Sequence, residues 1–123
     1  FGQASGSGVA LVAECGQHFL RSTSVLAVEV ALDFVAHFGL IERAVQAQGR
    51  QRRFELLQTL LVKTPEFAFT RPVIGFESYA KGELIATDGV DEIRAPCEDC
   101  TILMPTRKPV VGREAVYLTR PMD

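Results

Sequence analysis

The spacing of hydrophobic positions changes near the middle of this chain. Residues 9–14 (VALVAE) form an apolar run that ends in a carboxylate and shows no alternation of polar and apolar positions. A run of this kind is typical of a strand that is covered on both faces, inside a parallel α/β sheet. The pattern therefore predicts a strand over 9–14, with Glu14 at its carboxyl end.

A helical pattern follows over residues 22–39 (STSVLAVEVALDFVAHFG). Ser22, Thr23 or Ser24 is expected to cap its start, and Gly39 stands where a left-handed C-terminal residue belongs. Apart from one narrow polar stripe, the positions are almost all apolar. The predicted helix is therefore buried over most of its circumference, as a helix that lies on a sheet would be.

Beyond residue 53 the pattern consists of short strand candidates separated by Pro and Gly. This arrangement predicts a small antiparallel β lobe rather than further βαβ units. A polar connection at residues 48–53 precedes it. The candidate strands cover residues 54–62, 67–74, 83–88, 92–96, 101–105 and 115–119.

Together these patterns predict an α+β chain with two parts. Residues 1–50 are interpreted as the C-terminal end of an α/β domain, a strand with its covering helix, and residues 51–123 as a β-rich domain. A strand buried on both faces needs neighbouring strands that one helix cannot replace. We therefore expect the rest of that sheet to lie outside this sequence, which begins at Phe1.

Composition excludes several classes of partner. The 123 residues carry 13 basic and 15 acidic side chains, and neither half is strongly charged, so nothing favours nucleic-acid binding. No apolar run is long enough to span a bilayer, and no signal peptide opens the chain. Three cysteines fit free thiols in a reducing compartment. We expect a cytoplasmic protein that binds neither nucleic acid nor membrane.

Glu14 is the first candidate for chemistry. The carboxyl ends of α/β strands are where such sheets place ligands, and a carboxylate there is a candidate general base. The alternative is a strand end in water. His18 is a candidate ligand, proton carrier or substrate contact, or an ordinary loop residue. Cys15 is not expected to be reactive, because the charge of Glu14 disfavours its thiolate.

Two other groups have metal-binding side chains. The helical stripe of Glu29, Asp33 and His37 is favoured as a solvated edge rather than a metal site. Cys97 and Cys100 form a single CxxC between two short strands, whereas a structural zinc site usually has a second pair or histidines beside it. A β-turn is therefore favoured over a zinc or redox site.

Six stretches, in order, resemble the C-terminal part of the succinylglutamate desuccinylase/aspartoacylase family over nearly the whole chain. These are zinc-dependent deacylases with a carboxypeptidase-like α/β domain and a β-rich C-terminal domain. The resemblance implies the same two parts here. The stretches are GVALVAECGQHF (8–19), FVAHFGLIE (34–42), GFESYAKGELIATDG (75–89), EIRAP (92–96), TILMP (101–105) and VVGREAVYL (110–118).

The resemblance also implies roles for single residues. Glu14 matches the family's catalytic glutamate, a general base that acts on zinc-bound water and then passes the proton to the leaving amine. Tyr117, in EAVY, matches a tyrosine that reaches the substrate. The family's zinc ligands, an HxxE pair and a later histidine, and its arginines for a substrate carboxylate lie upstream of the part matched here. His18 matches none of these ligands, so we expect no metal ligand within this chain.

We therefore expect a C-terminal fragment of a zinc-dependent amidohydrolase that cleaves N-acyl amino acids or related amides and is inactive by itself. Its β lobe would cap the active site and support a homo-oligomer. One alternative is a non-catalytic binding or oligomerisation module in which Glu14 is structural. Another is a metal or redox protein built on Cys97 and Cys100.

Overall fold

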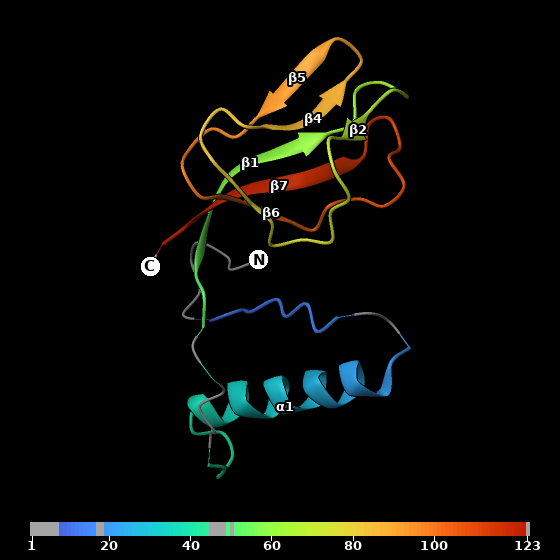
Figure 1. Cartoon of the computed structure of the whole chain (residues 1–123). Coiled ribbons are helices and arrows are strands. Elements are labelled where there is room, and N and C mark those ends of the chain that lie inside the picture. The colour runs from blue at the N-terminus through green and yellow to red at the C-terminus, as the bar shows by residue number, and fades with distance from the viewer. Residues whose placement is uncertain (1–7, 17–18, 45–48, 50, 123) are drawn as a thin grey trace. The chain divides into compact units, whose positions relative to one another are not determined.

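The computed structural model describes residues 8–16, 19–44, 49 and 51–122, which divide into two compact units, 1–49 and 50–123. The first unit contains one helix and the second contains two antiparallel sheets (Figure 1), so the predicted α+β class is confirmed. No helix among these residues has the length and apolar content to cross a membrane. The elements are α1 (Arg21–His37), β1 (Phe54–Leu61), β2 (Ala68–Phe69), β3 (Ser78–Tyr79), β4 (Leu84–Asp88), β5 (Asp91–Arg94), β6 (Cys100–Leu103) and β7 (Glu114–Pro121).

The predicted strand over 9–14 is wrong for this chain, because these residues take part in no sheet. Within the described residues no other strand of the first unit exists to pair with them. Leu11, Ala13 and Cys15 line one side of a small apolar cavity of about 340 Å³, and residues of α1 line the other. The segment thus packs on the helix as a strand would, without the neighbours that would make it one.

Helix α1 begins at Arg21, and its N-cap is Leu20, which makes no side-chain capping bond. The predicted capping by Ser22, Thr23 or Ser24 is therefore wrong. The helical turn starts earlier than that cluster of hydroxyls, because the backbone N–H groups of both Thr23 and Ser24 already donate to the Leu20 carbonyl.

The C-terminal end of α1 is as predicted. Gly39 has φ +70°, a left-handed conformation that glycine adopts without steric cost. Its N–H donates to Ala36 O at 2.9 Å, and the N–H of Leu40 donates to Val35 O at 3.1 Å. This pair of bonds is the Schellman arrangement that closes many helices.

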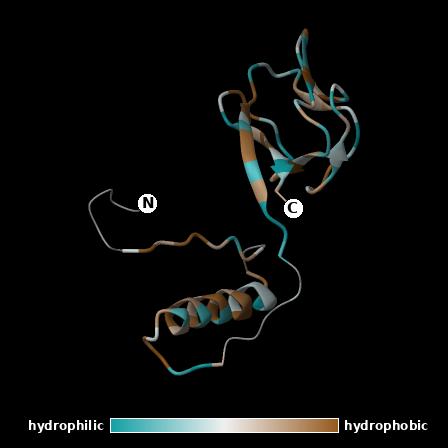
Figure 2. Cartoon of the chain, turned by 90° about the vertical axis from the view of Figure 1, so that its left-hand side faces the viewer, coloured by the Kyte–Doolittle hydropathy of each residue, from teal (hydrophilic) through white to brown (hydrophobic). Residues whose placement is uncertain are grey.

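No residue of α1 is buried, so the prediction of a mostly buried helix is also wrong within this chain. Apolar side chains such as Val25 and Val28 remain 53% and 57% exposed. Figure 2 shows the apolar residues that recur along the helix. Exposed apolar side chains such as Val25 and Val28 have no covering layer among the described residues.

The second unit has two sheets, with strand orders β1-β7-β6-β3 and β2-β4-β5, and every pairing is antiparallel. Strands β1 and β5 therefore each lie at an edge. The buried residues of the core come from both sheets and from the segments that join them: Val62, Phe67, Tyr79, Ile85, Ala86, Ala95, Cys100, Ile102, Ala115, Val116 and Leu118.

Most predicted strands of this unit are present within a few residues of their expected bounds. The exception is 67–74, of which only Ala68–Phe69 is a strand. The N–H of Thr70 still donates to Ile85 O, but Pro72 has no N–H to continue the ladder. Strand β3 was not predicted, since its two residues, Ser78 and Tyr79, are too short for a periodic signal.

Candidate functional site

Glu14 stands at the end of the segment that packs on α1. Leu11, Ala13 and Cys15 line the cavity on the helix side, and Glu14 is not among its lining residues. The Glu14 side chain is exposed, and no hydrogen bond or ion pair joins it to another residue that the structure describes.

Gly16 explains the local sequence after Glu14. It has φ +113°, and a Cβ at this position would lie 3.3 Å from Thr23 Oγ1. Only glycine adopts this turn without strain, so the chain bends directly after Cys15 toward the start of α1. Cys15 is half-buried, with its thiol 3.8 Å from Ala13 O. His18 lies outside the described residues.

The polar stripe of α1 is occupied by an arginine rather than arranged for a metal. The guanidinium of Arg43 pairs with Glu29 and lies 2.9 Å from Asp33 Oδ1. The hydrogen bond to Glu29, followed by the charges of both carboxylates, raises the pKa of Arg43. His37 packs edge-on against Phe38, with ring centroids 5.0 Å apart. The sequence did not reveal the Arg43 contact, which spans up to 14 residues.

Tyr117 lies on β7, between β1 and β6, opposite Thr59 and Leu103. It is half-buried, and its hydroxyl donates to Glu114 Oε2 at 2.5 Å. A phenol oxygen can donate one hydrogen bond and also accept hydrogen bonds. Glu14 and Tyr117 belong to different units, so each residue is described only by its surroundings within its own unit.

Cys97 and Cys100 flank a turn formed by Glu98 and Asp99 between β5 and β6, which confirms the predicted turn. Cys100 is completely buried, and this burial, followed by the neighbouring Cys97 thiol, raises the pKa of Cys100 to about 11. In the part of the chain that is described, no group of three or more His, Cys, Asp or Glu side chains is placed to hold a metal ion. The CxxC pair therefore lacks further ligands there.

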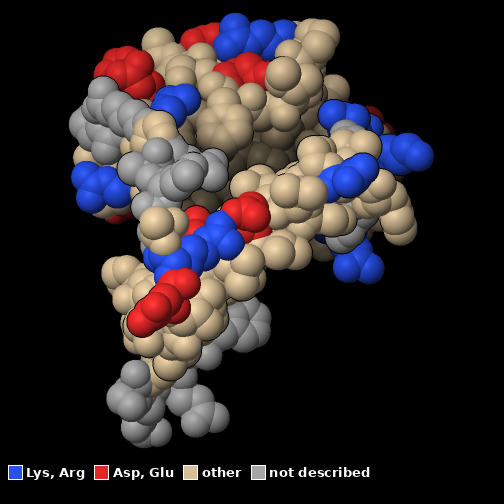
Figure 3. Space-filling model, turned by 90° about the horizontal axis from the view of Figure 1, so that it is seen from below, with Lys and Arg blue, Asp and Glu red and all other residues tan. Residues whose placement is uncertain are grey.

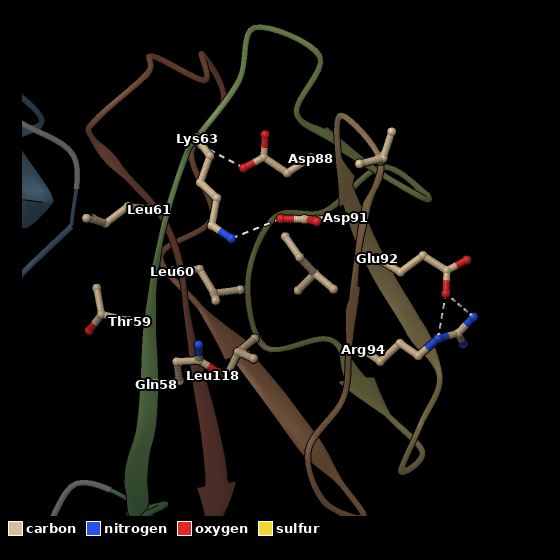
Figure 4. Close-up of a pocket in the computed structure, with 12 residues that line it drawn as sticks. Gln58, Thr59, Leu60, Leu61, Lys63, Asp88, Asp91, Glu92, Arg94 and Leu118 are labelled. Atoms are coloured by element: carbon tan, nitrogen blue, oxygen red, sulfur yellow. Dashed lines mark hydrogen bonds and ion pairs between the residues drawn. The ribbon is translucent and has the colours of Figure 1, made fainter.

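A groove of about 900 Å³ in the second unit was not predicted. It lies between the edge strands β1 and β5 (Figure 4), and Leu60, Ile93 and Leu118 give it an apolar lining. Lys63 Nζ lies 3.0 Å from Asp91 Oδ2 across it. Strand alternation places Tyr117 on the face of β7 opposite Leu118, away from the groove. Such a groove depends on which strands lie at the sheet edges, and no local pattern reports that.

Asp88 closes one end of this groove. Although only 3% exposed, its carboxylate accepts hydrogen bonds from the backbone N–H of Lys63 (2.7 Å) and from the N–H and hydroxyl of Thr64 (2.8 and 2.7 Å). Burial by itself would raise the pKa of Asp88, but these hydrogen bonds outweigh it and hold the pKa below its ordinary value. Asp88 thus ties the end of β4 to the segment that follows β1.

Charged side chains do not gather into a single-sign surface on the face shown in Figure 3, where basic and acidic residues are interspersed. Several of them are paired within the second unit. Arg94 binds Glu92, and Arg120 binds Glu55. Exposed pairs of this kind contribute little to stability.

No family model and no curated protein matches this chain. Among solved structures, it is similar to the crystal structure of succinylglutamate desuccinylase from Vibrio cholerae, with a TM-score of 0.61 and 23% sequence identity. The match covers 89% of this chain and 32% of that one, so the chain spans about a third of the enzyme it resembles. Because a match of this extent is longer than either unit, it includes residues of both. At this identity the likeness establishes the fold, a partial carboxypeptidase-like α+β arrangement.

Proposed function

We propose that this chain is the C-terminal part of a zinc-dependent deacylase of the succinylglutamate desuccinylase/aspartoacylase family. The whole enzyme would hydrolyse an N-acyl amino acid or a related small amide in the cytoplasm. One observation carries the proposal: the match to a solved desuccinylase covers 89% of this chain, which is more than either unit alone, so it includes residues of both. A shared β lobe alone would be weaker support, because one fold serves many functions.

Glu14 is the proposed general base. Its carboxylate would accept a proton from the attacking water and deliver it to the nitrogen of the leaving amine. Two features of the structure support this role: the side chain has no partner among the described residues, and it is exposed rather than part of the cavity lining beside α1. Gly16 supports it indirectly, since the bend there ends the segment directly beyond Glu14 and Cys15.

The zinc does not fit the residues described here. None of them form a group of three or more metal-binding side chains, and the carboxylates of the α1 stripe are paired with Arg43. Zinc would be held by residues other than those described here, as the family resemblance implies. The proposal accordingly assigns no metal ligand and no metal-dependent step to this chain.

Tyr117 is the proposed substrate contact. With its proton donated to Glu114, the phenolic oxygen would act as an acceptor toward an N–H or ammonium group of the substrate. Glu114 would hold the ring hydroxyl in place through this hydrogen bond. The contribution expected of one such hydrogen bond is about 0.5–1.5 kcal/mol.

The test uses the natural protein that carries this sequence, purified with its bound metal. Release of free amine is measured over a panel of N-acyl amino acids, with and without a zinc chelator, and the zinc content is determined. Chelator-sensitive hydrolysis with about one zinc per chain is the expected result. A protein that contains no zinc and hydrolyses no member of the panel would favour the alternative, a binding or oligomerisation module.

A further inference from the structure

The turn between β5 and β6 places two thiols together. Glu98 and Asp99 form its corner, with Cys97 before them and Cys100 after them. In a β-turn the first and fourth Cα atoms lie within about 7 Å, and disulfides usually span about 4.4–6.8 Å between Cα atoms. Burial, followed by the effect of the Cys97 thiol, raises the pKa of Cys100.

This turn is held in shape independently of the thiols. Asp99 has φ +51°, a left-handed conformation that Asp tolerates better than most residues. The carboxylate of Glu98 accepts from the N–H of Lys81, and the N–H of Ala95 donates to Glu83 O. A turn fixed in this way keeps the sulfur atoms close and lowers the entropic cost of joining them.

The two thiols differ in access and surroundings. Cys100 is 0% exposed and begins β6, where it pairs with Tyr79 of β3. Cys97 is half-buried. A reagent from solvent therefore meets Cys97 first, while Cys100 is placed to react with the sulfur of Cys97.

We propose that Cys97 and Cys100 form a reversible disulfide by exchange with a small-molecule disulfide such as oxidised glutathione. The Cys97 thiolate attacks one sulfur of the reagent, forms a mixed disulfide and releases one thiolate. Cys100, after losing its proton, attacks the Cys97 sulfur and releases the second thiolate. The two protons lost by the protein go to the two released thiolates, and two electrons pass from the protein to the reagent. This modification does not depend on the proposed hydrolase function.

The test uses the 123-residue chain equilibrated in buffers of increasing oxidised-to-reduced glutathione ratio, quenched with acid, alkylated and mapped by mass spectrometry. The expected wild-type product has a 97–100 disulfide and one alkylated thiol, that of Cys15. The control Cys15→Ser should form the same disulfide. In Cys100→Ala a glutathione adduct should accumulate on Cys97. Wild type that keeps its three thiols at every ratio, or holds a lasting glutathione adduct on Cys97, overturns the proposal.

A second measurement separates a built site from the ordinary behaviour of a flexible CxxC segment. The same titration is repeated in concentrated urea, where the turn is lost. The preformed turn should raise the equilibrium constant for the 97–100 disulfide by about tenfold or more over that of the unfolded chain, because it raises the effective concentration of one thiol at the other. An equal or smaller constant in the folded chain would refute the inference. Both measurements on the wild-type chain stand whether or not the Cys100→Ala variant folds.

Discussion

Ile102 offers the sharpest test of how the β unit is held together. Its side chain is 0% exposed, in the middle of β6 and opposite Leu118 of β7. Its backbone forms two hydrogen bonds with the loop before β3. The N–H of Ile102 donates to Glu77 O at 3.0 Å, and its carbonyl accepts from the N–H of Phe76 at 2.7 Å. A change of side chain leaves those backbone bonds in place, so the substitution Ile102→Ala isolates apolar packing.

The expected cost is large for a unit of this size. Removing a buried Ile side chain down to Ala destabilises by about 2–5 kcal/mol, and Ile to Val by about 0.5–1.5 kcal/mol. At about 0.05–0.15 kcal/mol per residue, residues 50–123 have a total stability of only roughly 4–11 kcal/mol. With roughly 4–8 °C lost per kcal/mol in such a domain, Ile102→Ala should lower the melting midpoint by about 8 °C or more.

The assay is urea and thermal unfolding followed by far-ultraviolet circular dichroism, since the chain has no tryptophan. The matched control is Ile74→Ala, which makes the same chemical change at a side chain that is 84% exposed. It should cost little, and Ile102→Val should fall between the two. If Ile102→Ala cost no more than Ile74→Ala, β6 would not be the packed centre of this unit.

Three further predictions concern other parts of the molecule. Because hydrogen bonds hold the pKa of Asp88 below its ordinary 3.8, its ionised form stabilises the fold above that pH, and this contribution disappears as the pH falls through the lowered value. Asp88→Asn should lower the urea midpoint at neutral pH, and the midpoint of this variant should fall less steeply below about pH 4 than that of the wild type. Asp91→Asn, at an exposed position, should have neither effect. Equal effects of the two substitutions would refute the stabilising role of Asp88. In the natural protein, Tyr117→Phe should lower kcat/KM about 2–10-fold, and an unchanged value would remove the substrate contact. The 123-residue chain should self-associate through the uncovered apolar face of α1, as light scattering over a concentration series would detect, and Val28→Glu should reduce it; a strictly monomeric wild-type chain would contradict this.

The features that the sequence predicted well are those fixed by nearby residues. Gly39 ends α1 because a left-handed residue is needed there, and the polar pair Glu98–Asp99 forms a turn between two strands. Most strands of the β unit were also found, since their apolar runs are bounded by Pro or Gly. Each of these depends on the backbone preferences of a few consecutive residues.

The features that were missed depend on distant parts of the chain. Arg43 pairs with the α1 stripe from beyond the end of the helix, and Asp88 binds a segment 24 to 25 residues away. The groove between β1 and β5 exists because topology leaves both strands at sheet edges.

The prediction of a buried strand over 9–14 and a buried helix was wrong for a different reason. The apolar pattern of both segments fits a larger sheet than the described residues supply. Among the described residues, apolar side chains of α1 such as Val25 remain exposed, and residues 9–14 have no neighbouring strand. Hydrophobicity alone does not say which segments would bury such a pattern.

The most direct test of the proposed function is Glu14→Gln in the natural protein that carries this sequence. The control is Glu42→Gln, which removes the same charge from another exposed position of the first unit. Turnover of the best N-acyl substrate is measured beside zinc content and unfolding midpoint. The account predicts a fall in kcat of about 10²–10⁴-fold for Glu14→Gln, with zinc and stability kept, and no loss for Glu42→Gln. Wild-type turnover by Glu14→Gln would show that this carboxylate is a solvated chain position and not the general base.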